Sequence, residues 1–264
     1  FLFDKKYVLC TKTFAMSFLS RSLLFVLLLP ALFGSNPQSD FLKAQKQYKR
    51  VKAAFEEKES LLRKKLQSHE IAFDNFNLLL VAYKNEDLIE VYAQAKESKV
   101  YKKIISYKVC TRSGKLGPKR KQGDLQVPEG FYYIDRFNPA SSFYLSLGIN
   151  YPNLSDKRKS KATDLGGDIF IHGACASIGC LPITNDCIKE LYVLAVWAKH
   201  YGQSKIPVYI FPFKMTNQAL ETYKKQYNQE TAAFWDNLKQ GYDHFSRQPR
   251  ELPFSINAQG DYVF

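Results

Sequence analysis

The chain has 264 residues, of which 45% are hydrophobic, 15% aromatic and 24% charged. This is the composition of a globular protein and excludes an intrinsically disordered one. The formal net charge of +13 predicts attraction to a polyanion or an anionic surface. The sequence has no Cys/His spacing of the zinc-finger type and no glycine-rich phosphate loop, so we expect no nucleic-acid partner.

Residues 1–38 have the pattern of an export signal. Arg21 precedes a short apolar run, Leu23–Phe33, which ends in small and polar residues from Gly34 onward. This order is typical of a secretory signal peptide, and the run is shorter than the roughly 20 residues of a membrane-spanning helix. We predict an upstream extension plus a signal peptide in residues 1–38, with an uncleaved N-terminal membrane anchor as the alternative. Either form predicts an exported protein of the periplasm or cell envelope.

The next predicted unit is a helical segment, residues 39–74. Between Asp40 and Gln67, apolar residues recur at steps of three and four, with Lys, Arg, Glu and Gln between them. This period predicts one amphipathic helix with a buried stripe. We expect that stripe to pack on the domain that follows.

Residues 75–214 read as a β-rich domain. Two short apolar runs, 77–84 and 88–94, flank a polar turn at 85–87, which predicts a β-hairpin. Further strands are expected at 104–111, 131–135, 143–147, 168–172 and 208–213.

Loops and helices complete the predicted fold. The segment 113–130, punctuated by glycine and proline, and the polar, basic segment 153–165 are expected to be loops. A helix is predicted from Thr184, a good N-cap, to about His200. In residues 215–264 we expect one or two helices and a terminal strand at 254–264, with a turn at Gln259–Gly260, all packed on the core. The whole pattern predicts an α+β fold, with a helix before a β-rich core and helices after it.

The segment Ile171–Pro182 combines a nucleophile with a base. A predicted strand ends at His172, and Cys180 follows eight residues later in a glycine-bearing loop. A neighbouring imidazole can hold a cysteine as the thiolate, which is its nucleophilic form. Gly173 and Gly179 allow a tight backbone turn, and the amides of Gly179 and Cys180 are candidates for an oxyanion hole.

The residues alone leave other interpretations open. Cysteine is among the most buried residue types, so these cysteines are also candidates for a purely structural role. In an oxidising compartment some of them are expected to pair, although the sequence gives no connectivity. A zinc site is the third interpretation. Its four candidate ligands are His172, Cys175, Cys180 and Cys187.

The stretch HGACASIGCLPIT, which begins at His172, resembles the active-site motif of the YkuD family, the L,D-transpeptidase catalytic domain, in its YafK-type branch. Three further segments are similar to that branch: 117–135, 138–153 and 235–245. The resemblance covers most of the chain from about Asp40 onward. It implies a YkuD-type mixed β-sandwich as the catalytic core, with residues 75–214 as the catalytic domain.

The resemblance also implies roles for residues of the motif. His172 corresponds to the proton acceptor and donor, and Cys180 to the nucleophile. The widespread form of the motif has a longer gap after the first histidine and a second histidine where this chain has Ile178, a departure that the YafK-type branch shares. Supporting positions of the motif correspond to Gly173, Ser177, Ile178 and Gly179.

The implied reaction is acyl transfer on peptidoglycan stem peptides through a thioester on Cys180, with no metal or other cofactor. Transfer to an amine gives a cross-link, and transfer to water gives hydrolysis. One alternative is an amidase of the same fold that cleaves a stem-peptide amide or releases a wall-attached protein from peptidoglycan. A non-catalytic wall-binding or metal-binding protein is the other. Because no acidic residue lies close to His172 in the motif, we expect a backbone carbonyl to orient the imidazole.

Overall fold

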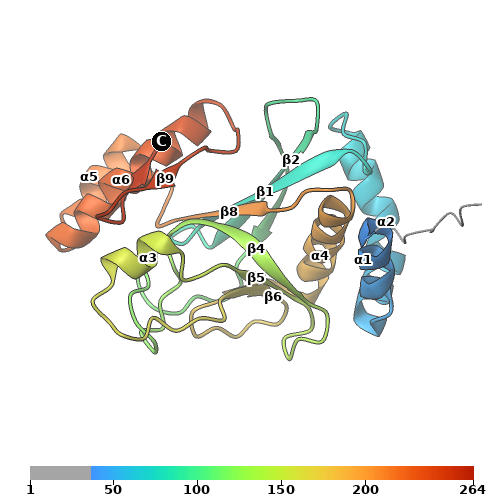
Figure 1. Cartoon of the computed structure of the whole chain (residues 1–264), viewed down its shortest axis with the longest axis horizontal. Helices are drawn as coiled ribbons and strands as arrows, with labels where there is room; N and C mark the ends of the chain where they lie inside the picture. The colour runs from blue at the N-terminus through green and yellow to red at the C-terminus, as the bar shows by residue number, and fades with distance from the viewer. Residues whose placement is uncertain (1–36) are drawn as a thin grey trace, which may run out of the picture. The chain divides into compact units, whose positions relative to one another are not determined.

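Eight strands hydrogen bond into a single sheet in residues 37–264, the part of the chain that the computed structural model describes (Figure 1). The strand order is β3-β2-β1-β8-β4-β5-β6-β7. These strands are β1 (Phe76–Tyr83), β2 (Leu88–Ala95), β3 (Lys102–Lys108), β4 (Gly130–Asn138), β5 (Ser146–Ile149), β6 (Phe170–His172), β7 (Leu181–Pro182) and β8 (Ile206–Phe211). A second, two-stranded sheet pairs β9 (Ser255–Ile256) with β10 (Tyr262–Val263).

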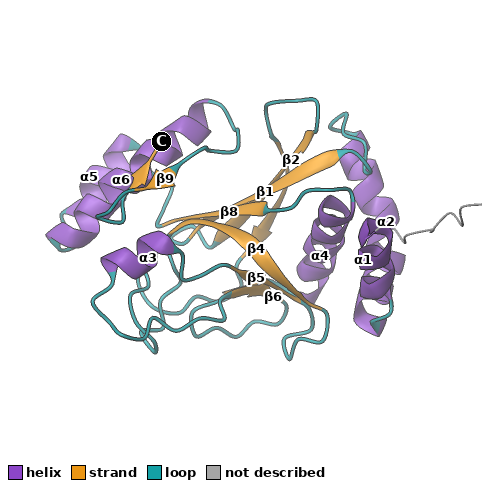
Figure 2. Ribbon diagram, viewed as in Figure 1, coloured by secondary structure: helices purple, strands orange, loops and turns teal. Residues whose placement is uncertain are grey.

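Helices cover both faces of the large sheet (Figure 2). They are α1 (Pro37–Lys46), α2 (Lys49–Gln67), α3 (Leu154–Lys159), α4 (Asn185–His200), α5 (Asn217–Lys224) and α6 (Gln229–Arg247). The predicted α+β class, with helices before and after a β-rich core, is confirmed. The predicted leader in residues 1–38 lies outside the described residues, apart from the first two positions of α1. No helix within residues 37–264 is long and apolar enough to cross a membrane.

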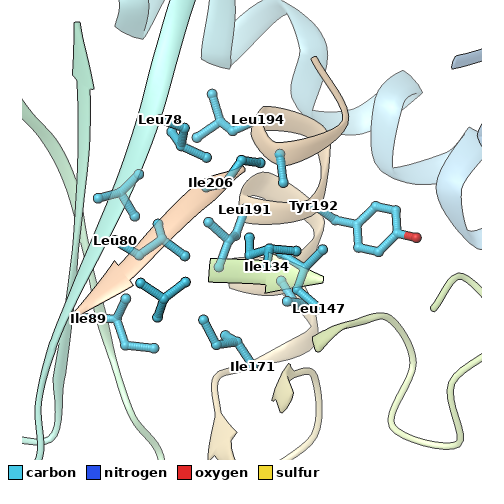
Figure 3. Packing of buried hydrophobic residues seen from close by; sticks show 14 of the residues in the cluster. Leu78, Leu80, Ile89, Ile134, Leu147, Ile171, Leu191, Tyr192, Leu194 and Ile206 are labelled. Atoms are coloured by element: carbon cyan, nitrogen blue, oxygen red, sulfur yellow. The ribbon is translucent and has the colours of Figure 1, made fainter. Parts of the chain in front are cut away.

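The sheet divides the interior into two hydrophobic cores. Successive side chains of a strand point to opposite faces. In β1, Leu78 and Leu80 therefore enter the core beneath α1, α2 and α4, whereas Leu79 and Val81 enter the core beneath α5 and α6. Figure 3 shows the first core, to which β1, β4, β5, β6, β8 and α4 all contribute. Burying each such leucine stabilises the fold by about 1.5–3 kcal/mol.

The large sheet curls until its two edge strands meet. Just beyond β3, the amide of Cys110 donates to the carbonyl oxygen of Pro182 in β7 at 3.0 Å. A disulfide joins Cys110 to Cys175 beside this contact and resolves the pairing that the sequence left open. The core that was predicted as a mixed β-sandwich is therefore one continuous, curled sheet.

Several predicted elements are confirmed. The hairpin at 77–84 and 88–94 is formed by β1 and β2, in which Tyr83 pairs with Leu88. Thr184 caps α4, because its side-chain oxygen accepts a hydrogen bond from the amide of Cys187 at 3.3 Å.

Two predictions about helices were wrong. The single helix expected over Asp40–Gln67 is broken at Tyr48, which has an extended backbone with φ −80° and ψ 126°. The segment 153–165, expected to be a loop, contains α3. This helix begins with a capping box in which Asn153 and Asp156 each bind the backbone amide of the other.

Two strand predictions were wrong in their boundaries. The strand expected at 143–147 begins only at Ser146, since Tyr144 has a left-handed backbone with φ 74° that no strand accommodates. The terminal strand expected at 254–264 is two short strands, β9 and β10, joined through the turn that was predicted at Gln259–Gly260.

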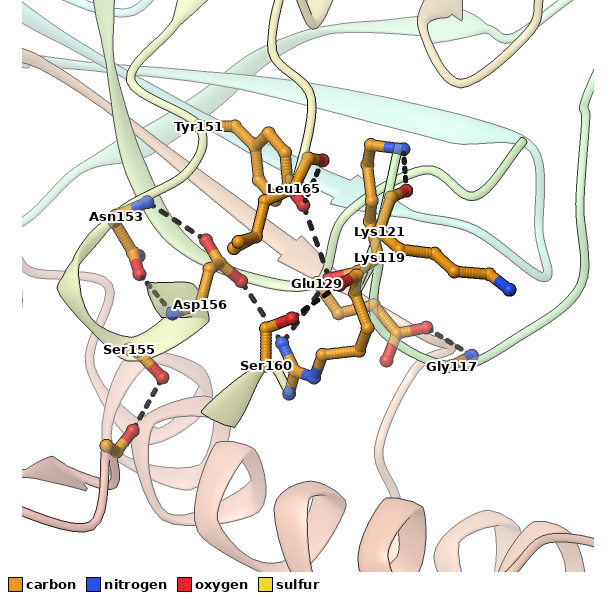
Figure 4. A network of polar contacts seen from close by, with 12 residues as sticks. Gly117, Lys119, Lys121, Glu129, Tyr151, Asn153, Ser155, Asp156, Ser160 and Leu165 are labelled. Carbon is orange, nitrogen blue, oxygen red and sulfur yellow. Dashed lines mark hydrogen bonds and ion pairs between the residues drawn. The ribbon is translucent and has the colours of Figure 1, made fainter. Parts of the chain in front are cut away.

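Buried polar contacts fix the long loop between β3 and β4. The side chains of Lys84 and Glu129 are both fully buried and form an ion pair of 2.8 Å. Glu129 also accepts hydrogen bonds from the amide of Gly117 at 2.7 Å and from the indole of Trp235 in α6 at 2.8 Å. Figure 4 shows the contact to Gly117 and, in the same view, Asp156 in the capping box of α3. The carboxylate of Glu129 thus ties the loop to the sheet and to α6.

We predict that Glu129→Gln lowers the free energy of unfolding by about 3–5 kcal/mol, because it leaves the ammonium of Lys84 buried without its counter-charge. Chemical denaturation measures the change. The matched control is Glu56→Gln, which removes an exposed ion pair to Lys52 and is expected to cost less than about 0.5 kcal/mol. Equal effects of the two substitutions would contradict this role of the buried pair.

Candidate active site

His172 is held by the backbone at the end of β6. Its side chain is 1% exposed, and Nδ1 lies 2.6 Å from the carbonyl oxygen of Gly173. Because a carbonyl oxygen only accepts, Nδ1 carries a proton and Nε2 of the neutral ring is left to act as a base. The expected orientation of His172 by a backbone carbonyl is confirmed. Burial lowers the pKa of His172, with the bond to Gly173 opposing that shift, so the ring favours its neutral form.

An aromatic side chain covers the imidazole. The ring of Phe143 lies 4.5 Å from that of His172, centroid to centroid, at an interplanar angle of 33°. Phe143 comes from the loop between β4 and β5 and is 44% exposed, so one part of its ring shields His172 while another faces solvent. Sequence reasoning missed Phe143 as a site residue and placed it in a strand.

The half-buried thiol of Cys180 lies immediately before β7 and donates to the carbonyl oxygen of Asp168 at 3.6 Å. Burial raises the pKa of this thiol, and the carboxylate of Asp168 adds to the rise. A backbone hydrogen bond from Phe170 and the charge of Lys119 oppose it. In this arrangement the thiol favours its protonated form.

The pairing of β6 with β7 brings the two predicted catalytic residues to one cavity. The strands are parallel, with His172 opposite Pro182 and Ile171 opposite Leu181. Ile171 and Leu181 both enter the first core, so the residue after the one, His172, and the residue before the other, Cys180, are directed away from that core. They line one cavity of about 490 Å³, and in the described chain no direct hydrogen bond joins them. The other lining residues are Asn138, Ser141, Ser142, Phe143, Ser146, Asp168, Phe170, Ala176, Ser177 and Ile178.

Ser177 organises the turn that presents Cys180. Its hydroxyl donates to the carbonyl oxygen of Cys180 at 2.8 Å. The hydroxyl oxygen of Ser177 in turn accepts hydrogen bonds from the amides of Gly179, at 3.2 Å, and Cys180, at 3.0 Å. Both amides proposed for the oxyanion hole are thus bound to Ser177 in this structure, and their role in catalysis stays a prediction.

The two glycines of the motif are required for different reasons. A Cβ atom at Gly173 would lie 2.6 Å from Oδ1 of Asn185 and 2.8 Å from the carbonyl oxygen of Phe143, so this position has no room for a side chain. Gly179 has φ +134°, a conformation that other residues rarely adopt. Between Ser177 and Gly179, Ile178 is 80% exposed at the rim of the cavity.

Two further contacts anchor the loop that joins β6 to β7. The disulfide between Cys175 and Cys110 ties it to the end of β3. Oδ1 of Asn185, the first residue of α4, accepts a hydrogen bond from the amide of Ala174 at 2.9 Å. Asn185 was missed by sequence reasoning, since nothing local marks an asparagine as the acceptor for a loop amide 11 residues earlier.

The zinc interpretation is not supported by this geometry. Cys175, one of its four candidate ligands, is bonded to Cys110 instead. Within residues 37–264 no three His, Cys, Asp or Glu side chains are grouped so that they could hold a metal ion.

The sequence of this chain is similar to those of known proteins. Residues 78–210 match the sequence model of YkuD, the L,D-transpeptidase catalytic domain. The chain belongs to the YkuD family. It is 37% identical over 183 residues to "Putative L,D-transpeptidase YafK" from two strains of Escherichia coli, and the match covers 69% of this chain and 71% of the relative. The resemblance to the YafK-type branch is thereby confirmed.

Two solved structures are similar to this YkuD-family chain. The first is the helical cell shape determining protein Pgp2 from Campylobacter jejuni, with a TM-score of 0.43 and 22% identity over 69% of this chain and 74% of that one. The second is Bd1075 from Bdellovibrio bacteriovorus, with a TM-score of 0.38 and 21% identity over 65% of this chain and 71% of that one.

The pKa shifts predict how the reactivity of Cys180 depends on pH. Because the thiol pKa is raised and the His172 pKa is lowered, the resting pair is a neutral thiol beside a neutral imidazole. We expect the rate of alkylation by iodoacetamide to keep rising above pH 8.5, the ordinary cysteine pKa being about 8.5. The measurement uses a chain in which Cys10 and Cys187 are serine, with Cys180→Ala as background. A plateau below pH 7 would indicate a preformed thiolate–imidazolium pair and contradict this assignment.

Proposed function

We propose that this YkuD-family protein is a peptidoglycan-modifying cysteine enzyme that transfers acyl groups of stem peptides through a thioester on Cys180. One observation carries the proposal: the buried, carbonyl-bound imidazole of His172 and the thiol of Cys180 line the same cavity, on the same face of β6 and β7. Membership in the L,D-transpeptidase family supports the choice of chemistry.

In the first step, Nε2 of His172 takes the thiol proton as Sγ of Cys180 attacks the carbonyl carbon of an amide in the stem peptide. For this, a rotation about the Cα–Cβ bond of Cys180 exchanges the weak contact with Asp168 for one with the imidazole. The bond from Nδ1 to the carbonyl oxygen of Gly173 stabilises the imidazolium that forms. The C–N bond then breaks, His172 returns the proton to the leaving amine, and a thioester remains on Cys180.

In the second step, an amine or a water molecule attacks the thioester. His172 accepts a proton from the attacking group and delivers it to the departing sulfur, which restores the neutral pair. An amine acceptor yields a cross-link, and water yields hydrolysis. In both steps we propose that the amides of Gly179 and Cys180 leave Ser177 and bind the oxyanion, while the hydroxyl of Ser177 keeps its bond to the carbonyl oxygen of Cys180.

Charge and the leader sequence complete the proposal. A net charge of +13 supports binding to an anionic cell wall. We propose that residues 1–38 direct the chain across the membrane, as a cleaved signal peptide or as an anchor, so that it works in the periplasm or cell envelope.

The test is product analysis with peptidoglycan sacculi and with diaminopimelate-containing tetrapeptides, read by mass spectrometry. We predict that Cys180→Ala abolishes turnover and that His172→Ala lowers kcat by about 10²–10⁴-fold, the usual contribution of a general acid–base. Cys187→Ser, on α4 and away from the cavity lining, is the control expected to retain activity.

The products then define the reaction. New dimers assign transpeptidation, release of D-alanine without dimers assigns carboxypeptidase activity, and cleavage of only a protein–peptidoglycan link assigns the amidase alternative. Identical products from the unaltered protein and Cys180→Ala on both substrates would refute Cys180 as the nucleophile.

A further inference from the structure

A side chain of α2 reaches across to the loop that covers His172. Nη1 of Arg50 donates to the carbonyl oxygens of Ser141, at 2.6 Å, and Tyr144, at 2.8 Å. Its guanidinium also lies 5.4 Å from the centroid of the Tyr144 ring. Three contacts from one side chain thus clamp the β4–β5 loop, residues 139–145, from a helix more than 90 residues away in sequence.

The clamped loop is conformationally strained. Tyr144 has φ 74°, which costs free energy for a residue with a bulky side chain. Such a conformation persists only where surrounding contacts determine it. Arg50 binds the carbonyl oxygen of Tyr144, and Lys189 of α4 lies 5.7 Å from the centroid of its ring. The strained residue Tyr144 is thus contacted by one cation from α2, Arg50, and by one from α4, Lys189.

The same loop makes contacts with the proposed base. Phe143, next to Tyr144, packs against the ring of His172, and the carbonyl oxygen of Leu145 accepts a hydrogen bond from the amide of Gly173 at 3.1 Å. Gly173 is the residue whose own carbonyl oxygen binds Nδ1 of His172. A displacement of this loop therefore changes both the packing and the hydrogen-bonding frame of the imidazole.

The helix that carries Arg50 is itself firmly attached. Val51 and Phe55 of α2 are buried in the core, and Lys58 forms ion pairs with Asp186, at 2.6 Å, and Glu190, at 3.4 Å, both on α4. Because α2 is held in place by these contacts, its side chain Arg50 can restrict the position of the loop that it binds. Helix α2 ends before residue 78, where the match to the family model begins.

We propose that Arg50 is a positioning residue for the reaction. It fixes the β4–β5 loop so that Phe143 holds His172 in the orientation that serves Cys180, and the helical segment before the family domain thereby completes the active site. This inference rests on the proposed roles of His172 and Cys180.

The main test variant is Arg50→Met, which keeps the aliphatic stem but removes both hydrogen bonds. We expect kcat of the Cys180-dependent reaction to fall by about 10–100-fold, as for a catalytic group displaced by about 1 Å, with a smaller change in KM. Arg50→Lys is expected to restore most of the loss, because a single nitrogen makes both bonds and an ammonium also has several donors. Lys52→Ala, an exposed position on the same helix, is the matched control.

A double-mutant cycle separates positioning from a general loss of stability. If Arg50 acts through Phe143, then Arg50→Met has little further effect on kcat in a Phe143→Ala background, whereas independent effects would add. The thermal unfolding temperature of each variant is measured alongside. Full additivity, or an Arg50→Met variant with the kcat of Lys52→Ala, would overturn the proposal.

Alkylation of Cys180 by iodoacetamide at pH 7 provides a readout that needs no peptidoglycan. We expect Arg50→Met to change this rate in the same direction as His172→Ala, with Lys52→Ala unchanged. If the peptidoglycan chemistry is wrong, turnover is insensitive to Cys180→Ala, but the alkylation comparison still decides the role of Arg50. An Arg50→Met rate equal to that of Lys52→Ala would refute the positioning role by itself.

Discussion

The two-residue parallel pairing of β6 with β7 is the constraint on which the rest of the site depends. It places Ile171 opposite Leu181 and His172 opposite Pro182, and the carbonyl oxygen of His172 accepts a hydrogen bond from the amide of Ile183 at 2.8 Å. So short a strand pair is stable only because its surroundings hold it. The curled sheet brings the end of β3 to β7, and the disulfide at Cys175 limits the intervening loop. Because of this pairing, His172 and Cys180, which are eight residues apart in the sequence, line the same cavity.

Electrostatics then determine the kind of cysteine chemistry that the site supports. Burial disfavours both the imidazolium of His172 and the thiolate of Cys180, and the site has a backbone carbonyl where many cysteine enzymes have a carboxylate or amide partner for the histidine. In the proposed mechanism, charge therefore develops during attack on the substrate rather than in the resting protein. Groups that we propose to fix the imidazole, Phe143 and Arg50, gain importance because no ion pair to His172 occurs within residues 37–264.

Sequence patterns predicted the parts of this structure that local chemistry controls. Alternating apolar residues around a polar turn predicted the β1–β2 hairpin, and Thr184 predicted the start of α4. The HGACASIGC stretch predicted that His172 and Cys180 share a site, and both line one cavity. The same reasoning failed at α3, where a polar composition concealed the capping box of Asn153 and Asp156. It also could not find Phe143, Asn185 or Arg50, because their roles arise from contacts between distant segments. The pairing of Cys110 with Cys175 depends likewise on closure of the sheet.

The central claim, a thioester on Cys180, is tested most directly by trapping it. The protein is mixed with a stem tetrapeptide, quenched in acid within seconds, digested with a protease and mapped by mass spectrometry. The account predicts an acyl adduct on the peptide that contains Cys180, lost on treatment with hydroxylamine and absent from Cys180→Ala. An adduct on Cys187 would contradict the account. So would product formation that depends on Cys180 if no adduct is found on Cys180 with a saturating acyl donor and no added amine acceptor.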